Sequence, residues 1–440
     1  MGKDLVRGIT SSIGYPYDAF TCARAAWLFL AFLQPFNQFG ALRWIALVVL
    51  SITLAILISR NIRKSRDYYP ATWTNRIGLI LLGWIVVTSL VGPYPRESLV
   101  AMRQDLITQV MIFAAGLLLV QSSRDAWRFV MASLLGFGLM SVLSISDAIA
   151  LISSRGLGDR SYSHDSWWGG YGGKGGYFLP LILGWLTFHT KRRWALVGGT
   201  FFLLMTVTLV ALYGSRSPLL VATVGGIALI FFRFGSRSAV IGTTFALLLL
   251  GAVVLSPLGH IFRYDSLVVP NTYITNEGLS SRPKIWDGML EIIQVRPISG
   301  YGYGWKKLAW VINDRGFAER WRNGSDPADY FLAGKSKASY GRVNPHNYYL
   351  QVLFEIGAVG LTLVLIFWAF VFREGLFLLR KSAPKSSRGF AVTTLAVLIA
   401  YFVANLTNGY WVGGLANLSL SLAGCILSVS RISQHEIVKR

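Results

Sequence analysis

The stretch SYGRVNPHNYYLQVLFEIGAVG, residues 339–360, joins a polar, basic segment directly to an apolar helix. The apolar run begins at Tyr348 and continues to Phe372, which exceeds the roughly 20 residues that a helix needs to cross a bilayer. Pro345, His346 and Asn347 lie at the junction. The sequence therefore predicts a membrane helix whose N-terminal end carries His346 at the water boundary.

The N-terminus of a helix carries partial positive charge, so it attracts anions and disfavours a protonated imidazole. A neutral His346 beside such a helix end is typical of a general base that faces a phosphorylated substrate. The plainer interpretation is that Pro-His-Asn only starts the helix, and a single histidine leaves that interpretation open.

The composition indicates a polytopic membrane protein. Of the 440 residues, 53% are hydrophobic and only 14% are charged, whereas a soluble domain has about 25% charged residues. The net charge of +22 predicts contact with acidic lipid head groups or lipid-linked phosphates rather than with nucleic acid. Cys22 and Cys425, at opposite ends of the sequence, provide neither a disulfide framework nor a zinc-ligand spacing.

About twelve apolar stretches are candidate membrane spans, so the predicted fold is all-α: 22–38, 41–59, 77–92, 100–120, 127–149, 176–189, 194–213, 218–233, 238–257, 348–372, 389–407 and 412–430. With both termini in the cytoplasm, the main Lys/Arg clusters fall inside, as the positive-inside rule requires. In a bacterium this predicts a multi-pass inner-membrane protein. Its expected parts are nine spans in 1–257, a large periplasmic loop in 258–347, and three spans in 348–440.

The loop itself is expected to be partly helical. In SSRPKIWDGMLEIIQVRP, residues 280–297, Ser281 or Arg282 would cap a helix with Pro283 at its first position. Its apolar stripe would consist of Ile285, Trp286, Met289, Leu290 and Ile293. The following glycines, Gly300, Gly302 and Gly304, predict a turn that packs closely against a helix, because no βαβ unit surrounds them to support nucleotide binding.

Three outward helix starts each carry a basic side chain: Arg216 just before Ser217 and Pro218, Arg282 in the loop, and His346. An arginine at a span end commonly snorkels to head groups. Arginine is also the side chain that clamps phosphate through two parallel hydrogen bonds. Together the three predict a site for a diphosphate leaving group, with His346 as base and Arg216 and Arg282 as clamps.

Four short motifs occur in order in the second half of the chain: GSRSPLL at 214–220, SR-x-x-x-W at 281–286, RP-x-x-G-x-G-x-G at 296–304, and PHN-x-x-L-x-x-x-x-E-x-G at 345–357. In order and spacing they resemble the O-antigen ligase and O-antigen polymerase superfamily, and the number of predicted spans agrees over the whole chain. Residues from Ile312 to Val343 match no motif.

The resemblance implies a GT-C-like glycosyltransferase that uses undecaprenyl-diphosphate-linked glycan as donor. A ligase passes the glycan to lipid A-core, whereas a polymerase passes it to another lipid-linked repeat. By position, the family's functional arginines map to Arg216 and Arg282 and its histidine to His346. The reaction is expected to invert the anomeric centre and to need neither metal nor cofactor.

Further substrate contacts are expected from Lys284, Asn347 and Tyr348, and stacking on sugar rings from Trp167 and Trp168. Each tryptophan has the alternative role of an interfacial aromatic belt. The outer segments have no D-x-D pair for a divalent cation, since Asp326 and Asp329 are poorly spaced. This agrees with a metal-independent reaction.

The ligase is favoured over the polymerase because 312–343 carries a basic excess that suits an anionic acceptor. Two other classes stay open: a polysaccharide transporter, and a structural partner of a glycan-assembly complex. A transporter would bind near the bilayer midplane and often shows repeated halves. Here the basic residues gather at the outer face and no repeat is visible.

Overall fold

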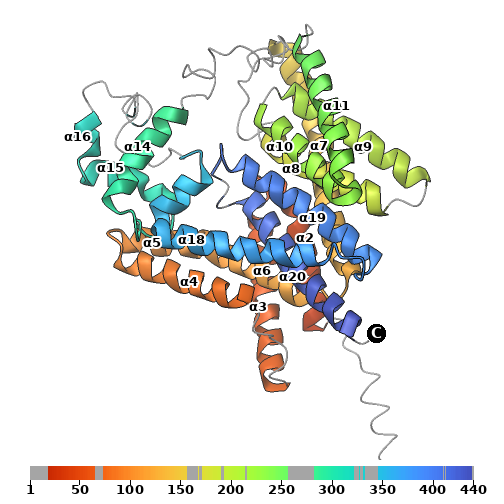
Figure 1. Ribbon diagram of the computed structural model, residues 1–440. Coiled ribbons are helices and arrows are strands. Elements are labelled where there is room, and N and C mark those ends of the chain that lie inside the picture. The colour runs from red at the N-terminus through yellow and green to blue at the C-terminus, as the bar shows by residue number, and fades with distance from the viewer. Residues whose placement is uncertain are drawn as a thin grey trace, which may run out of the picture.

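The computed structural model describes residues 18–64, 73–155, 167, 171–189, 193–213, 216–255, 282–321, 327, 331, 345–409, 411 and 413–438. Within these ranges every regular element is a helix (Figure 1). The first part contains α2 (Ala19–Leu33), α3 (Gly40–Lys64), α4 (Trp73–Val91), α5 (Pro95–Ala101), a π-helical segment (Met102–Leu106), α6 (Ile107–Leu119), α7 (Ser123–Arg155), α8 (Tyr171–His189), α9 (Arg193–Leu212), α10 (Arg216–Phe234) and α11 (Ser236–Leu255).

The second part begins with the loop helices and ends with three long helices. They are α14 (Arg282–Val295), the 3₁₀ segment η5 (Trp305–Lys307), α15 (Leu308–Asp314), α16 (Phe317–Trp321), α18 (Tyr348–Phe377), α19 (Lys385–Ala404) and α20 (Gly414–Val438). Figure 1 shows α14, α15 and α16 gathered near the first turns of α18, away from the long helices of the bundle.

All twelve predicted spans overlap a helix, which supports a polytopic all-α membrane protein. Among the described residues, nine helical segments are long and apolar enough to cross a membrane. The predicted spans on α2, α8 and α11 are not among these nine, and α2 has only 15 residues. The number twelve therefore stays a prediction.

Several boundaries differ from those expected. The span predicted at 389–407 ends as helix at Ala404, and its last three residues begin a turn. The span predicted at 100–120 is the end of a longer helical run that starts at Pro95 and passes through the π segment. These limits depend on tertiary contacts, which the composition of an apolar run does not encode.

The centre of the bundle is α19, which packs against α7, α8, α10, α18 and α20. Almost every residue on it from Gly389 to Tyr401 is buried, which agrees with a helix that is apolar all round. The pairs α6 with α20 and α4 with α18 lie beside it. Because α19 is held on all sides, the turn that follows it has a fixed position.

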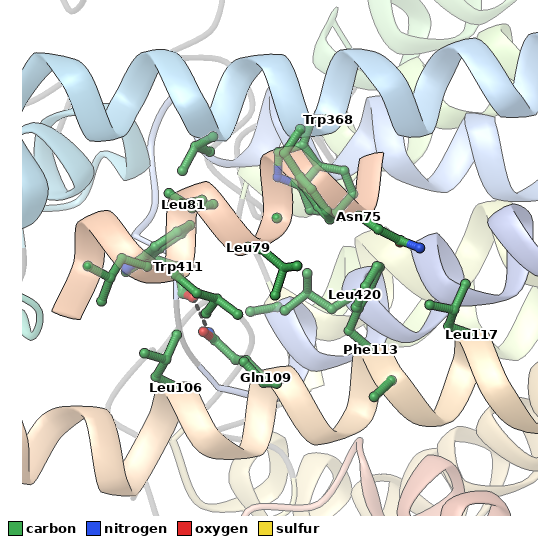
Figure 2. Close-up of a pocket in the computed structure, with 18 of the residues that line it drawn as sticks. Asn75, Leu79, Leu81, Leu106, Gln109, Phe113, Leu117, Trp368, Trp411 and Leu420 are labelled. Carbon is green, nitrogen blue, oxygen red and sulfur yellow. Dashed lines mark hydrogen bonds between the residues drawn. The ribbon is translucent and has the colours of Figure 1, made fainter. Parts of the chain in front are cut away.

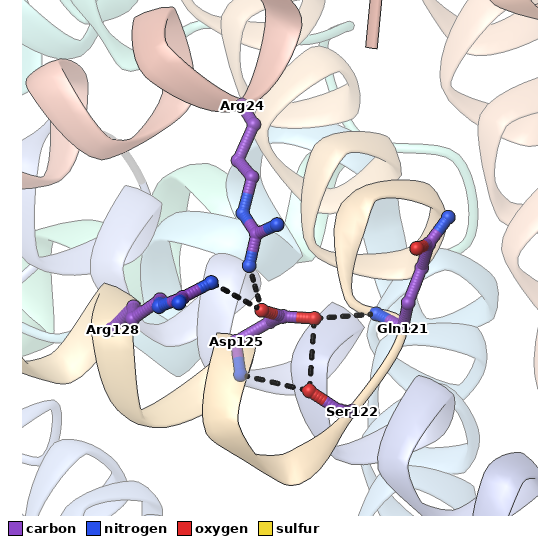
Figure 3. Close-up of polar contacts among 5 residues, drawn as sticks. All are labelled: Arg24, Gln121, Ser122, Asp125 and Arg128. Carbon is purple, nitrogen blue, oxygen red and sulfur yellow. Dashed lines mark hydrogen bonds and ion pairs between the residues drawn. The ribbon is translucent and has the colours of Figure 1, made fainter. Parts of the chain in front are cut away.

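A buried carboxylate joins two of these helices at one end of the bundle (Figure 3). Asp125, in the first turn of α7, pairs with Arg24 of α2 and with Arg128 one turn later. It also accepts hydrogen bonds from the Gln121 amide at 3.2 Å and the Ser122 hydroxyl at 3.0 Å. With this many partners the charge is compensated, so the cluster acts as a structural tie between α2 and α7.

The loop helix predicted at 280–297 is present as α14, although its buried stripe differs from the one expected. Ile285, Met289, Ile292 and Ile293 are buried, whereas Leu290 is 44% exposed. They pack with α15, α16 and Phe354 of α18 in a separate small core. Leu290 was therefore wrongly placed in the stripe, because the surface that the helix meets comes from segments distant in sequence.

Candidate functional site

His346 has an unusual backbone. Its φ is 50°, and it is the one non-glycine residue with positive φ among those that the structure describes. A left-handed conformation costs a non-glycine residue roughly 1–3 kcal/mol and persists only where the surroundings impose it. The next residue, Asn347, is extended and serves as the N-cap of α18. The strained residue therefore lies just outside the helix N-terminus, as the sequence predicts.

Asn347 holds this helix end in place with both ends of its side-chain amide. Its Oδ1 accepts hydrogen bonds from the amides of Tyr349 at 2.9 Å and Leu350 at 3.0 Å. Its Nδ2 donates to the Leu406 carbonyl at 3.0 Å. The Tyr348 amide donates to the Asn405 carbonyl at 3.0 Å. The start of α18 is thus tied to residues 405–408 after α19, which we name the asparagine turn.

The asparagine turn also reaches the start of α10. Asn408 Nδ2 donates to the Ser217 hydroxyl at 3.3 Å and to the Ala404 carbonyl at 3.1 Å. Ser217 is the second residue of α10, so Arg216 is already the first helical residue rather than the residue before the cap. The side chain of Arg216 lies outside the described part. The asparagine turn consequently brings together the starts of α10 and α18, which are far apart in sequence.

Arg282 acts on His346 electrostatically. The pKa of His346 is lowered from 6.5 to about 4. Burial is the larger cause of this shift, and the positive charge of Arg282 is the second. Arg282 is the first residue of α14, and α14 packs against α18. The imidazole is therefore neutral at pH 7, and Arg282 lies close enough for its charge to lower the pKa of His346.

The glycine turn, residues 300–304, fixes α14 relative to α18. Gly300, Gly302 and Gly304 all have positive φ, and a Cβ on Gly300 would lie 2.7 Å from the backbone of Glu355. The Tyr301 amide donates to the Phe354 carbonyl at 2.8 Å, and the Ala358 amide donates to the Pro297 carbonyl at 2.8 Å. The predicted role of these glycines, close packing against a helix, is confirmed.

This docking requires a break in α18. Gly357 has φ 68° and ψ −173° inside the helix, and a Cβ there would clash with the Ile298 carbonyl. The break leaves backbone groups of α18 free for partners from outside: the Ile356 carbonyl accepts a hydrogen bond from the Trp84 indole at 2.9 Å. The first part of α18, which presents His346, is thus a separate short segment held by α4 and the glycine turn.

The other predicted substrate contacts lie in varied surroundings. Lys284 is half-buried in the first turn of α14. The Tyr348 side chain is fully buried, with ring contacts to Tyr349, Tyr401 and Trp411. Trp167 packs edge-on against Phe36, with ring centres 5.7 Å apart. Trp168 lies outside the described residues. Contact of these residues with a substrate stays a prediction.

An apolar pocket of about 270 Å³ lies between the pair α4–α18 and the pair α6–α20 (Figure 2). Its lining is mainly apolar, with leucine the most frequent residue, and Tyr348, Tyr401 and Trp411 also line it. Gln109, the polar lining residue of α6, donates to the Trp411 carbonyl at 2.5 Å (Figure 2). Tyr348 lines the pocket and is also the first residue of α18, so the pocket adjoins the helix start that follows His346.

Sequence reasoning missed Asn405 and Asn408, which organise the site. They lie in NLTN, a composition typical of a turn after a helix, but its first three residues were included in the span predicted at 389–407 because they follow a long apolar run. It also missed the pair Lys307 and Glu355 as partners. The partnership of Lys307 and Glu355 is not predictable from local sequence, since tertiary contacts bring the glycine turn to α18.

Comparison with known proteins identifies one family. Residues 200–365 match the family model described as O-antigen ligase, which is somewhat more than a third of the chain. The matched range includes Arg216, Arg282 and His346, but not the asparagine turn. No curated protein matches the chain.

Proposed function

We propose, from the premise that residues 200–365 match the O-antigen ligase family model, that the protein is an O-antigen ligase. In this proposal it moves a glycan from undecaprenyl diphosphate to lipid A-core, inverting the anomeric centre without a metal. It lies in the bacterial inner membrane with both termini in the cytoplasm. Segment 258–347 and the site face the periplasm.

The observation that carries the proposal is the meeting of three helix starts around one site. The asparagine turn binds the starts of α10 and α18, and the charge of Arg282 at the start of α14 reaches His346. Three helix dipoles and two arginines attract a highly charged anion, and a diphosphate is such an anion. A neutral imidazole next to it is able to accept a proton.

The chemistry is a single displacement. An acceptor hydroxyl attacks the anomeric carbon of the donor sugar while His346 takes the hydroxyl proton. The bond between that carbon and the diphosphate oxygen breaks, and the electron pair leaves with the diphosphate. Arg216 and Arg282 stabilise the negative charge that develops there. One displacement at one carbon inverts its configuration.

The effect of Arg282 on the pKa of His346 should be smaller once the donor binds. In the free protein, burial and then the positive charge of Arg282 lower the pKa of the imidazole. When a diphosphate binds Arg282, the negative charge offsets the guanidinium and raises the pKa of His346 toward its ordinary value. The imidazole then becomes a stronger base in the complex that needs one, which improves proton transfer.

The polymerase is the alternative, because it would use the same base and clamps. The described part of 312–343 is balanced in charge, with Arg315 and Arg320 against Asp314 and Glu319. The basic excess that favours a lipid A-core acceptor therefore comes from Arg322, Lys335, Lys337 and Arg342, outside the described residues. A transporter is less favoured, because the candidate site lies at helix ends rather than midway along the helices.

The deciding experiment supplies the purified protein with lipid-linked glycan, with and without lipid A-core, in excess EDTA. We expect transfer to the core and no reaction without it. Chain growth on the lipid carrier without core would establish the polymerase. Activity that is lost on chelation and restored by magnesium or manganese would contradict the metal-independent mechanism.

The first prediction concerns the base. His346→Ala should lower transfer by about 10²–10⁴-fold, the usual contribution of a general base. His435→Ala is the matched control, since His435 is an exposed histidine near the end of α20. Thermal unfolding in detergent checks that both variants fold. Near-normal transfer by His346→Ala would reduce His346 to a helix-start residue.

A further inference from the structure

Lys307 is a buried ammonium group outside the three predicted catalytic residues. It is 1% exposed, and its Nζ donates to the carbonyls of Tyr301 at 3.2 Å, Gly302 at 2.7 Å and Tyr303 at 2.9 Å. It also donates to the Ser98 hydroxyl of α5. Carbonyls in the glycine turn converge on one cation because the left-handed glycines allow the chain to curl around it. The ammonium group thus organises the glycine turn from within.

Glu355 holds the same turn from the side of α18. Its side chain is fully buried, Oε2 accepts from the Gly304 amide at 2.6 Å, and Oε1 accepts from Gln351 Nε2 at 2.8 Å. The charges of Lys307 and Glu355 attract each other. Burial lowers the pKa of Lys307 to about 8, while the carboxylates of Glu355 and Glu97 oppose that shift.

The glycine turn lies at the base of two helical arms. One arm is α14, which runs back from the turn for 14 residues, about 20 Å, to Arg282. The other is the start of α18, about two turns long from Glu355 back to Tyr348, beyond which lies His346. The arms pack together through Ile285, Met289 and Phe354 among others. A small rotation at their base would displace Arg282 relative to His346.

We propose that Lys307 and Glu355 are one positioning unit, which locks the glycine turn to α18 and so sets the place of His346 relative to Arg282. This inference rests on the proposed function for its catalytic meaning. Neither residue touches the reacting atoms. Their effect is on the geometry of the arms that carry the base and one clamp.

The unit is expected to behave as a coupled pair. Removing one member leaves the other charge buried and uncompensated, which costs more than removing both. Lys307→Met and Glu355→Gln should each lower kcat at least tenfold with little change in the KM for donor. The double variant Lys307→Met/Glu355→Gln should recover part of the loss. Lys306→Met is the matched control, because Lys306 is the adjacent lysine and is exposed.

A second measurement is independent of catalysis. Nitroxide labels on Asp287→Cys in α14 and Leu406→Cys beside Asn347, with Cys22 and Cys425 replaced, report the separation of the arms by pulsed dipolar spectroscopy. Both labelled positions are exposed. We expect a narrow distance distribution in the parent, a broader one in Lys307→Met, and narrowing again in the double variant.

The results distinguish failure of the positioning unit from failure of the proposed function. Equal losses in the single and double variants, or a distance distribution in Lys307→Met as narrow as in the parent, would overturn the positioning unit. If Lys307→Met fails to fold, Glu355→Gln and the double variant make the same comparison. If Lys307→Met broadens the distance distribution but the parent protein transfers no glycan, the positioning unit is supported and the proposed function is rejected.

Discussion

His346 shows how one residue can combine backbone strain with an altered ionisation. Its φ of 50° lies in the left-handed region, one residue before the N-cap of α18. Partial burial and the charge of Arg282 keep it neutral. Part of the pKa shift comes from Arg282, which is distant in sequence, so a substitution at Arg282 should alter the ionisation of His346 without changing His346 itself.

The pH dependence of the reaction tests this. Because the pKa of His346 is lowered from 6.5 to about 4, kcat/KM should rise with pH through an acid limb near pH 4 and be flat by pH 6.5. Arg282→Gln should move that limb upward but not as far as 6.5, since burial, the larger cause, persists. An acid limb at 6.5 in the parent would contradict a lowered pKa.

The lowered pKa of His346 also makes the stability of the folded protein depend on pH. The unfolded chain protonates His346 below pH 6.5, whereas the folded protein does so only near pH 4. The unfolded state therefore binds more protons between these values, and this residue makes folding less favourable as the pH falls through that window.

The clamps make a different prediction at the residue scale. Arg216→Lys and Arg282→Lys should each lower kcat/KM by at least tenfold, because an ammonium group cannot reproduce the two parallel hydrogen bonds of a guanidinium to phosphate. Arg237→Lys, near the start of α11, provides a control. Full activity in either clamp variant would reduce that arginine to a membrane anchor.

At the scale of the element, α18 is two helices joined at Gly357. The break allows the glycine turn to hydrogen-bond to the backbone of α18 at Phe354 and Ala358. A continuous helix would occupy these groups internally, and in the broken helix any side chain at position 357 would clash with the Ile298 carbonyl. The position of His346 therefore depends on a glycine about three helical turns further along.

Gly357→Ala should consequently destabilise the protein and reduce transfer, because alanine resists φ 68° and its Cβ has no room. Gly83→Ala in α4 is the control: nothing lies within 4 Å of its Cβ position, so the change should be neutral or stabilising. Thermal unfolding in detergent and the transfer assay measure both effects. Equal stability of the two variants would mean that the break is not required.

For the whole molecule, the sequence predicts the helices well and their joints poorly. Long apolar runs and the Asn347 cap depend on local chemistry, so the start of α18 is found correctly. The asparagine turn, the Gly357 break and the burial of Ile292 in place of Leu290 depend on which segments meet. Of the site, the sequence predicts the three residue types, but not the asparagine turn that joins the starts of α10 and α18.

The membrane orientation of α19 can be tested by labelling cysteines near its two ends. Leu406 and Lys381 are exposed residues beyond opposite ends of α19. In a protein without its native cysteines, an impermeant maleimide should label Leu406→Cys in spheroplasts but label Lys381→Cys only after the membrane is permeabilised. Labelling of both positions from outside would contradict the proposed orientation.

The length of α18 also bears on the height of the proposed reaction above the membrane. Its 30 residues span about 45 Å, against about 30 Å for the hydrocarbon core, so nearly a third of the helix is surplus. If the part after Gly357 crosses the bilayer, the first part stands above it and lifts His346 clear of the lipid boundary. A hydroxyl held at the lipid surface lies too low to meet it. An acceptor whose hydroxyl is carried on several sugar units reaches that height, so the architecture would select acceptors by how far they rise from the membrane.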